Sequence, residues 1–288
     1  MKPIVQCRLC EHDNLITVYD FGQQHLSGQF PEAGEPEPAK VPLHLIRCGN
    51  CGLVQLKHTV EPELMFTKYS YRSSVSQTMR DHLKNVVHEA SDMLLKRDGR
   101  VCVAPRVLDI GGNDGYALDC IPFPTGVRTI VDPSDIPVEY PGINKIHGFF
   151  PDALLLTQKY DLIFSLACFY DADKPLQFAG AVKHILSPDG LWVCEVADLF
   201  SMLQNVLVDA VCPEHLTYLS TYNMTKIAQA CELKIVRIEL SNCNGGSARY
   251  YMTHKNSNAY VSTPDRLAQI GALWAAGRTL AEDADRFK

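Results

Sequence analysis

The chain of 288 residues lacks any apolar run of about eighteen residues, the length that a membrane-spanning helix needs. Its first residues, MKPIVQCRLCEHDN, also lack the apolar stretch of a secretion signal. We therefore expect a cytoplasmic protein, in which thiols stay reduced. The eleven cysteines are accordingly expected to be free thiols or metal ligands and not disulfides.

An excess of positive charge is also missing. The 27 Lys and Arg residues against 33 Asp and Glu residues give a formal net charge of −6, so the overall field repels nucleic acid, although a local basic patch stays compatible with it. We expect a small-molecule partner and neither nucleic acid nor a membrane. The length fits one large domain with a smaller appendage.

Four segments are expected along the chain. Residues 1–68 hold two cysteine pairs around a Pro- and Glu-rich loop, PEAGEPEPAK. Residues 69–100 hold a polar segment and a bridging helix from about Ser76 to Lys96, where apolar residues follow helical spacing. Residues 101–260 form the main domain. Residues 261–288 open on a Thr-Pro-Asp helix start and predict an amphipathic helix.

Short apolar runs separated by helix-sized intervals follow from Arg106 onward. The runs are RVLDI, VRTIVD, NKIHGFF, YDLIFSL, LWVCEV, LKIVRIEL and ARYYMTH. This alternation predicts an α/β fold, a doubly wound and mostly parallel sheet of seven strands with helices on both faces. The last two runs lie close enough to pair as an antiparallel hairpin at one edge of that sheet.

Two CxxC pairs, spaced like the knuckles of a zinc site, bracket the Pro-rich loop. Gly49 and Gly52 supply the backbone freedom that a knuckle needs. Ordinary buried cysteines or a redox pair are the alternatives, but a redox CxxC normally stands alone beside a βαβ unit. Four ligands leave no open position, so the site is structural, and its binding free energy of about 10–16 kcal/mol would hold together a lobe with little core of its own. The predicted ligands are Cys7, Cys10, Cys48 and Cys51.

The first run of the main domain ends in a glycine-rich turn, LDIGGNDG. A dinucleotide GxGxxG would need glycine where Asn113 and Tyr116 stand, and no GK[ST] follows. Three aspartates, Asp109, Asp114 and Asp119, crowd the turn with negative charge, which disfavours phosphate and favours a cation. The sulfonium and ammonium of S-adenosylmethionine fit such a turn.

An acidic residue at the end of the second strand completes this pattern. Asp132 follows Asp109 by 23 residues, near the spacing at which related folds bind ribose hydroxyls. A plain turn followed by a solvated strand end is the alternative. The residues predicted to bind the cofactor are Asp109, Gly111, Gly112, Asn113, Asp114, Gly115, Asp132 and Ser165.

Two further segments, YSYRSS at 69–74 and CPEHLTYLS at 212–220, combine reactive residue types and lie outside the predicted strands. Pro213 keeps Cys212 out of helical geometry, so Glu214 and His215 are expected on an irregular turn that aims both into one cleft. On the residues alone, a solvated Glu-His pair is as plausible as a catalytic pair.

The joint order CxxC…CxxC, YxYxSS, LDIGGNDG, EHLTYLS and GGSAR resembles the zinc-containing sugar C-methyltransferases, which act on nucleotide-linked 4-keto deoxysugars. The resemblance runs from Cys7 to Tyr251. It implies methylation of a carbon next to a ketone, through an enolate that a base generates. His215 matches the general base, Glu214 its acidic neighbour and Tyr71 a donor near the keto oxygen. It also implies a substrate-capping role for 69–100 and substrate contacts from Tyr69, Ser73, Tyr218 and Arg249.

Three features depart from that pattern. Cys212 stands where the family usually has tyrosine, and Asn244 stands where histidine commonly precedes GGS. Members usually continue into a further C-terminal domain, whereas this chain ends at Lys288, which indicates a shortened or truncated relative. Methylation of RNA or another small molecule, and a degenerate protein that only binds the cofactor, are the alternatives. The cysteines expected to be buried without a ligand role are Cys102, Cys120, Cys168, Cys194, Cys231 and Cys243.

Overall fold

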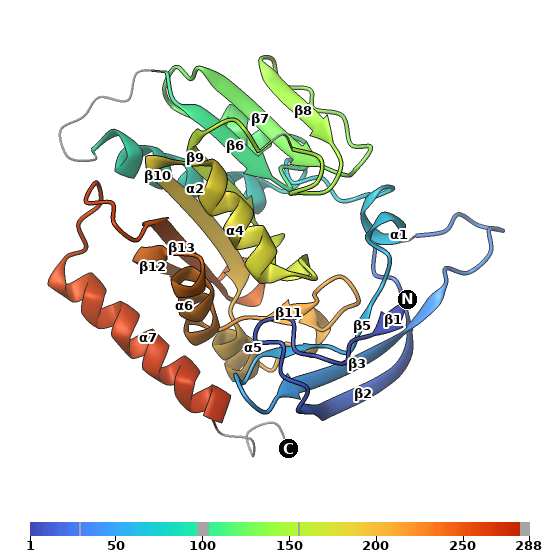
Figure 1. Cartoon of the computed structure of the whole chain (residues 1–288). Coiled ribbons are helices and arrows are strands. Elements are labelled where there is room, and N and C mark those ends of the chain that lie inside the picture. Colours follow the sequence, from blue (N-terminus) through green and yellow to red (C-terminus); the bar gives the residue numbers. More distant parts are fainter. Residues whose placement is uncertain (29, 97–103, 155, 283–288) are drawn as a thin grey trace.

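A computed structural model describes residues 1–28, 30–96, 104–154 and 156–282. Cys102 and the last six residues of the expected C-terminal helix lie outside these ranges. The chain forms a large seven-stranded sheet flanked by helices, with a smaller sheet beside it (Figure 1).

The large sheet has the strand order β12-β13-β10-β9-β6-β7-β8. Only β13 runs antiparallel to its neighbours, β10 and β12, so the predicted mostly parallel sheet with an edge hairpin is confirmed. The strands are β6 (Arg106–Ile110), β7 (Val127–Asp132), β8 (Ile143–His147), β9 (Tyr160–Leu166), β10 (Leu186–Ala197), β12 (Leu233–Ser241) and β13 (Ser247–His254).

Alternate residues of each strand enter opposite cores, because successive side chains point to opposite faces of a sheet. In β9, Leu162 and Phe164 join one buried cluster and Ile163 the other. The helices α2 (Gln77–Leu95) and α3 (Tyr116–Asp119) cover the first face. The helices α4 (Pro175–Ile185) and α6 (Thr221–Ala230) cover the second face (Figure 1). Helix α2 begins and ends within one residue of the predicted bounds, Ser76 and Lys96.

The last helix, α7 (Pro264–Glu282), lies outside α6 (Figure 1). It is not amphipathic as expected: its apolar residues do not gather on one face, and only Gly277 and Leu280 are buried. Its end reaches the smaller sheet, where the Arg47 guanidinium donates to the carbonyl of Ala281. The contact therefore depends on close approach at the helix end and not on an apolar stripe.

The smaller sheet has the order β11-β4-β3-β2, and a separate pair joins β1 (Lys2–Pro3) to β5 (His58–Thr59). Its strands are β2 (Leu15–His25), β3 (Lys40–Cys48), β4 (Val54–Leu56) and β11 (Thr217–Tyr218). Strand β11 corrects the expectation that the segment 212–220 lies outside the strands. Two residues that pair with a strand more than 150 positions away leave no local periodicity, so a sequence pattern has no means of showing β11.

The two parts of the molecule share their cores. Cys7, Cys48 and Leu53 belong to the same buried cluster as α4 and α6. A second cluster combines Leu43 and Val54 of the small sheet with residues of α5 (Leu199–Asn205) and β11. The short elements that complete the fold are α1 (Pro62–Phe66), η2 (Phe169–Asp171), η3 (Val208–Ala210) and η4 (Cys243–Gly245). Among the described residues, no helix is long and apolar enough to cross a bilayer.

Leu53 tests whether the small lobe is stabilised by the shared core. Its side chain is fully buried, so Leu53→Ala leaves a cavity and should lower the free energy of unfolding by about 2–5 kcal/mol, measured by urea denaturation. Leu267→Ala on the exposed surface of α7 is the control, expected within about 0.5 kcal/mol of wild type. Equal effects of the two substitutions would contradict the shared core.

Candidate functional site

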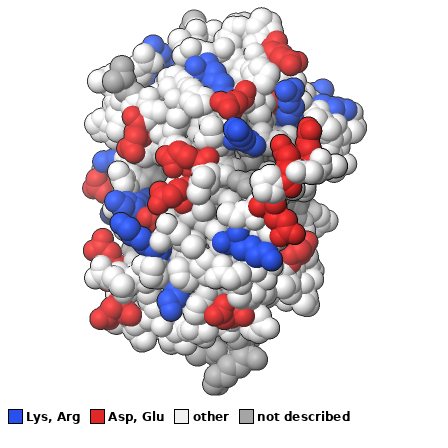
Figure 2. Space-filling model, turned by 90° about the vertical axis from the view of Figure 1, so that its right-hand side faces the viewer, with Lys and Arg blue, Asp and Glu red and all other residues white. Residues whose placement is uncertain are grey.

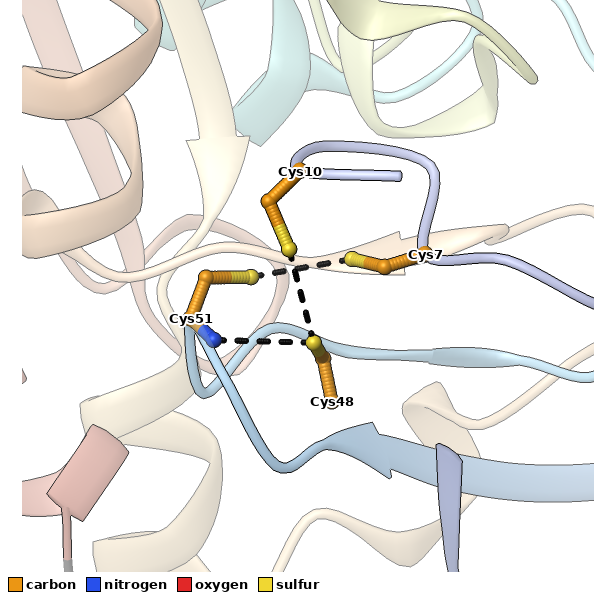
Figure 3. A group of neighbouring side chains, drawn as sticks. All are labelled: Cys7, Cys10, Cys48 and Cys51. Carbon is orange, nitrogen blue, oxygen red and sulfur yellow. Dashed lines mark hydrogen bonds between the residues drawn. The ribbon is translucent and has the colours of Figure 1, made fainter. Parts of the chain in front are cut away.

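Four cysteine sulfurs converge at the base of the small lobe (Figure 3). The Sγ atoms of Cys7 and Cys51 are 3.6 Å apart, as are those of Cys10 and Cys48, and all four lie within 4.8 Å of one another. A tetrahedral Zn²⁺ with bonds of about 2.3 Å holds its sulfurs roughly 3.8 Å apart, so the set fits zinc with little movement. The hydrogen bond between Cys51 and Cys7 lowers the pKa of the Cys7 thiol and raises that of Cys51, so without a metal the two sulfurs share one proton, with Cys7 as the thiolate.

Hydrogen-bond donors surround these sulfurs. The backbone amides of Leu9 and Asn50 point at the sulfurs of Cys7 and Cys48, each at 3.4 Å. Such N–H···S contacts orient ligands and offset thiolate charge. The knuckle glycines act differently from each other. Gly52 has φ +72°, whereas a Cβ on Gly49 would meet the Asn14 side chain at 2.3 Å, so Gly49 is required by lack of space.

Arg8, between the first two ligands, connects the metal site to the large domain. Its Nε lies 3.1 Å from Oδ1 of Asp173, in the loop that leads from η2 to α4, and its side chain also donates to the carbonyl of Leu56. The same Asp173 oxygen accepts from the hydroxyl of Thr59 at 2.8 Å. Arg8 of the first CxxC pair and Thr59 therefore both bind the loop that follows η2.

A cavity of about 420 Å³ opens at the carboxyl ends of β6, β7 and β9. Ligands of α/β sheets bind at this edge. The glycine turn, the end of β7, the residues after β8 and the η2 loop form its walls. The lining residues used below are Tyr69, Gly111, Asn113, Asp132, Phe149, Phe150, Cys168, Asp171 and Lys174.

Asp132 lies in this cavity with acceptor capacity to spare. Its Oδ2 accepts from the backbone amide of Asn113 at 2.9 Å, and its Oδ1 accepts from the amide of Ser134 at 2.8 Å and from the Ser134 hydroxyl. A carboxylate has about four lone-pair sites, so the side chain retains one for a further hydroxyl. This geometry suits a ribose.

Two residues of the glycine turn bind the YSYRSS segment. Asn113 accepts from the amide of Ser73 at 3.1 Å and donates to the carbonyl of Tyr71 at 2.9 Å, while Asp114 accepts from the amide of Ser74 at 2.9 Å. The side chains of Asn113 and Asp114 thus attach the tyrosine segment over the cavity, a use that the sequence does not suggest.

Asp109 supplies buried negative potential beneath the turn. Burial, and then the charges of Asp132 and Asp114, raise its pKa to about 8. Gly112 passes so close that a Cβ there would lie 2.9 Å from Asp109 Oδ2. Gly111 adopts φ +71° and Gly115 φ +88°, so both need glycine conformations. A cation bound here would relieve the crowding of carboxylates.

Two predicted contacts lie away from the cavity walls. The Ser165 hydroxyl is buried and accepts from the indole N–H of Trp192 at 2.9 Å. Arg249 is 3% exposed and pairs with Glu195 at 2.8 Å and Glu89 at 3.2 Å, and Glu195 also binds His82 at 2.6 Å. These hydrogen bonds stabilise the junction of β10, β13 and α2.

The catalytic candidates lie on a tight turn beside the η2 loop. The amide of His215 donates to the carbonyl of Cys212 at 3.2 Å across Pro213, which confirms the irregular turn. Nδ1 of His215 lies 2.9 Å from the carbonyl oxygen of Ala210. A carbonyl oxygen can only accept a hydrogen bond, so Nδ1 carries the proton and Nε2 of the neutral ring carries the lone pair. The ring also meets Tyr170 edge-on at 4.4 Å, and burial lowers the pKa of His215, which keeps it neutral.

Neighbouring groups complete this part of the site. Glu214 is buried and accepts from the hydroxyl of Ser27 at 2.8 Å. Tyr69 lines the cavity, and burial with the charges of Asp171 and Glu214 raises its pKa to about 12. Tyr71 stacks edge-on against Tyr69 at 6.3 Å and is 45% exposed. Tyr218, in β11, is buried, and burial raises its pKa.

Cys212 is no nucleophile in this setting. Burial, and then the charge of Glu214, raise the pKa of its thiol to about 12, so the reactive thiolate is scarce at neutral pH.

Sequence reasoning missed much of the cavity wall. Phe149 and Phe150, which follow β8, line the cavity, and so do Asp171 and Lys174 of the η2 loop. Cys168, expected to be buried in the core, also lines the cavity. The run GFFPD directly after a strand was the available signal for the aromatic wall. The η2 residues carry no comparable signal, because loop residues follow no periodicity.

Family comparisons agree with this geometry. Residues 74–238, more than half of the chain, match the model of a methyltransferase domain, and residues 7–66 match that of a zinc binding domain. The chain belongs to the methyltransferase family and has the class I methyltransferase fold. Its N-terminal lobe carries the four cysteines of a zinc binding domain.

One similar protein carries a more specific name than the family model. The C-methyltransferase NovU of Streptomyces niveus is 26% identical over 263 residues, which cover 86% of this chain and 60% of NovU. Among solved structures, a chain of the complex with the Haloferax volcanii Trm112 methyltransferase activator has a TM-score of 0.50 at 15% identity, covering 62% of this chain and 94% of that chain. The plantazolicin methyltransferase BpumL, in complex with SAH, has a TM-score of 0.50 at 14% identity, with 62% and 86% covered. Both show the fold.

Removing one zinc ligand tests the metal centre. Cys48→Ser should lower the zinc content from one ion per chain to well below half, measured by elemental analysis, because a hydroxyl is a poor zinc ligand. The melting temperature should fall as well, since zinc joins the lobe to the shared core. Cys231→Ser, outside the cluster, is the control and should keep full zinc. Full zinc in Cys48→Ser would exclude this site.

Asp109 predicts a pH-dependent cofactor affinity. Between pH about 4 and about 8, Asp109 keeps its proton in the folded protein but loses it in the unfolded chain. The contribution of Asp109 to the free energy of unfolding therefore decreases across this range and is lost as the pH rises through about 8. A cationic ligand favours the ionised form, so S-adenosylmethionine should bind more tightly from pH about 6 to about 8, by at most about tenfold per unit.

Calorimetry on Asp109→Asn measures this linkage. The variant should bind S-adenosylmethionine more weakly and show a flatter pH profile than wild type, whereas Asp119→Asn, at the exposed end of α3, should keep the wild-type profile. An unchanged slope in Asp109→Asn would show that another group titrates.

Proposed function

We propose that this protein transfers a methyl group from S-adenosylmethionine to a carbon next to a ketone on a nucleotide-linked deoxysugar. The observation that carries the proposal is His215, a neutral imidazole whose Nε2 is free and whose ring lies against the η2 loop of the cavity wall. Similarity to NovU, named a C-methyltransferase, supports carbon as the acceptor. The chain spans 60% of that relative, so its substrate is part of the proposal.

The chemistry needs a base because carbon does not attack a sulfonium without first losing a proton. His215 Nε2 takes the proton from the carbon next to the ketone, and the C–H electron pair moves into the enolate. The bound cofactor supplies an electrophilic methyl group on a positive sulfur. A C–C bond then forms as the S–CH₃ bond breaks, and the sulfur leaves as a neutral thioether. His215 returns its proton to solvent.

Other residues position the substrate in this proposal. Glu214 lies between the turn and Ser27 of the lobe, where it orients the sugar or the base. Tyr69 lines the cavity, Tyr71 packs edge-on against Tyr69, and the amide of Ser73 donates to Asn113 of the glycine turn. Tyr218 pairs with Val54 and so connects the turn to the small sheet. Asp109, the glycine turn and Asp132 bind the cofactor. Arg249 has two carboxylate partners already, so we leave it out of the residues that contact the substrate.

The domain division follows from these roles. We assign residues 1–68 to the zinc lobe, 69–100 to the substrate cap and bridging helix, 101–260 to the cofactor-binding domain and 261–288 to the C-terminal helix. A small-molecule substrate fits the cavity of about 420 Å³. Acidic and basic side chains are interspersed over the face in Figure 2, and no continuous basic tract for RNA crosses that face.

His215→Ala tests the base. Wild type incubated with labelled S-adenosylmethionine and a panel of nucleotide-linked 4-keto sugars should incorporate methyl groups, and the variant should lose about 10²–10⁴ of that rate while binding SAH normally. His184→Ala, exposed on α4, is the control. Because the His215 pKa is lowered, the rate should rise as the pH increases through a value below 6.5. Methylation that survives in His215→Ala would remove this residue from the mechanism.

A further inference from the structure

A carboxyl group that the mechanism above does not use lies where the cofactor cavity meets the catalytic turn. Asp171 ends η2 and lines the cavity. Its Oδ1 is buried and finds no hydrogen-bond partner among the residues that the structure describes. A buried polar atom without a partner costs about 1–3 kcal/mol, so the Asp171 carboxyl would gain stability if it turned toward a polar group of a bound molecule.

The surroundings of Asp171 are acidic. Burial, and then the charge of Glu214, raise its pKa well above the ordinary value, which favours the neutral carboxyl form over the carboxylate. Its other titratable neighbours are Tyr69, Tyr170, Cys212, Tyr218 and Cys168, whose own pKa values its charge would raise. The nearby Asp173 is already bound by Arg8, so that arginine is occupied elsewhere.

A neutral carboxyl offers an O–H donor, which an ionised one lacks. The enolate in the proposed reaction needs such a donor, because negative charge develops on the keto oxygen as the carbon loses its proton. The thiol of Cys212 is a weak donor, and Tyr71 is half exposed at the rim. Within the part of the chain that the structure describes, Asp171 alone is a cavity-lining residue with a buried oxygen that has no partner, and its loop binds the segment that follows His215.

We propose that the carboxyl group of Asp171 donates a hydrogen bond to the keto oxygen of the substrate and stabilises the enolate that His215 generates. This inference rests on the proposed function. No proton is transferred: the C–H proton goes to His215 Nε2, the charge stays on the enolate oxygen, and the Asp171 O–H remains bonded to its own oxygen.

The position of Asp171 is set by two contacts of its loop. Asp173, two residues on, is held by Arg8 and Thr59 of the zinc lobe. The carbonyl of Tyr170, one residue before, accepts from the Thr217 hydroxyl of β11 at 3.2 Å. The loop is thereby fixed from both sides, as a preorganised donor requires.

Two substitutions separate a donor from other roles. Asp171→Asn keeps an N–H donor of similar size, and Asp171→Ala removes it. Enolate formation is measured without methyl transfer, as exchange of the carbon-bound proton of a nucleotide-linked 4-keto sugar in D₂O with SAH bound, followed by NMR. Asp171→Ala should lose about 10²–10³ in exchange rate and Asp171→Asn at most about tenfold. Equal losses in both, which a base or a charge contact with the sulfonium would produce, would overturn the proposal, as would wild-type rates in both.

Protonation of Asp171 is tested without any sugar. The infrared difference spectrum of wild type minus Asp171→Asn, with SAH bound at pH 7, should contain the C=O stretch of a protonated carboxyl. Carboxylate bands instead would overturn the inference and leave the proposed function standing. Conversely, a protonated Asp171 in a protein that neither methylates nor exchanges any keto sugar would contradict the proposed function, and with it the donor role. Melting temperature and SAH affinity are measured for both variants, and exchange rates are compared only with SAH at saturation and below the melting temperature of each variant, which controls for folding.

Discussion

The convergence of four thiolates on one metal ion is the constraint on which the rest of the site depends. It joins residues 7–10 to residues 48–51 (Figure 3), and Arg8, between the first two ligands, binds Asp173 in the loop after η2. The same lobe pairs β4 with β11, directly after His215. The lobe that the four cysteines hold together thus contacts both the η2 loop and the segment that carries His215.

Negative charge organises the cofactor side. Asp109, Asp114 and Asp132 lie under or beside one turn, and burial, together with the charges of Asp132 and Asp114, raises the pKa of Asp109 to about 8. A cation bound at this turn would offset that cost. The same turn also binds the backbone of residues 71–74 through Asn113 and Asp114, which links it to the tyrosine segment.

The parts of the site that follow local rules were predictable, and the parts that depend on distant partners were not. The CxxC pairs and the LDIGGNDG turn each combine several informative residues within ten positions. Ser165 and Arg249 do not line the cavity, and a strand position does not reveal which face carries the side chain: one binds Trp192, and the other is enclosed by Glu195 and Glu89. Asp171 was missed because its meaning comes from burial beside Glu214.

The sequence by itself determined the α/β fold, the zinc ligands and the cofactor turn, because strand periodicity, ligand spacing and glycine conformation are local properties. The tertiary structure alone decided that EHLTYLS adds a strand to the zinc lobe and that His215 Nδ1 binds the carbonyl of Ala210. It also decided that Asp171 lines the cavity while its Oδ1 is buried with no partner in the described part of the chain. Each of these depends on which groups are buried together, and burial is set by contacts between residues far apart in the chain.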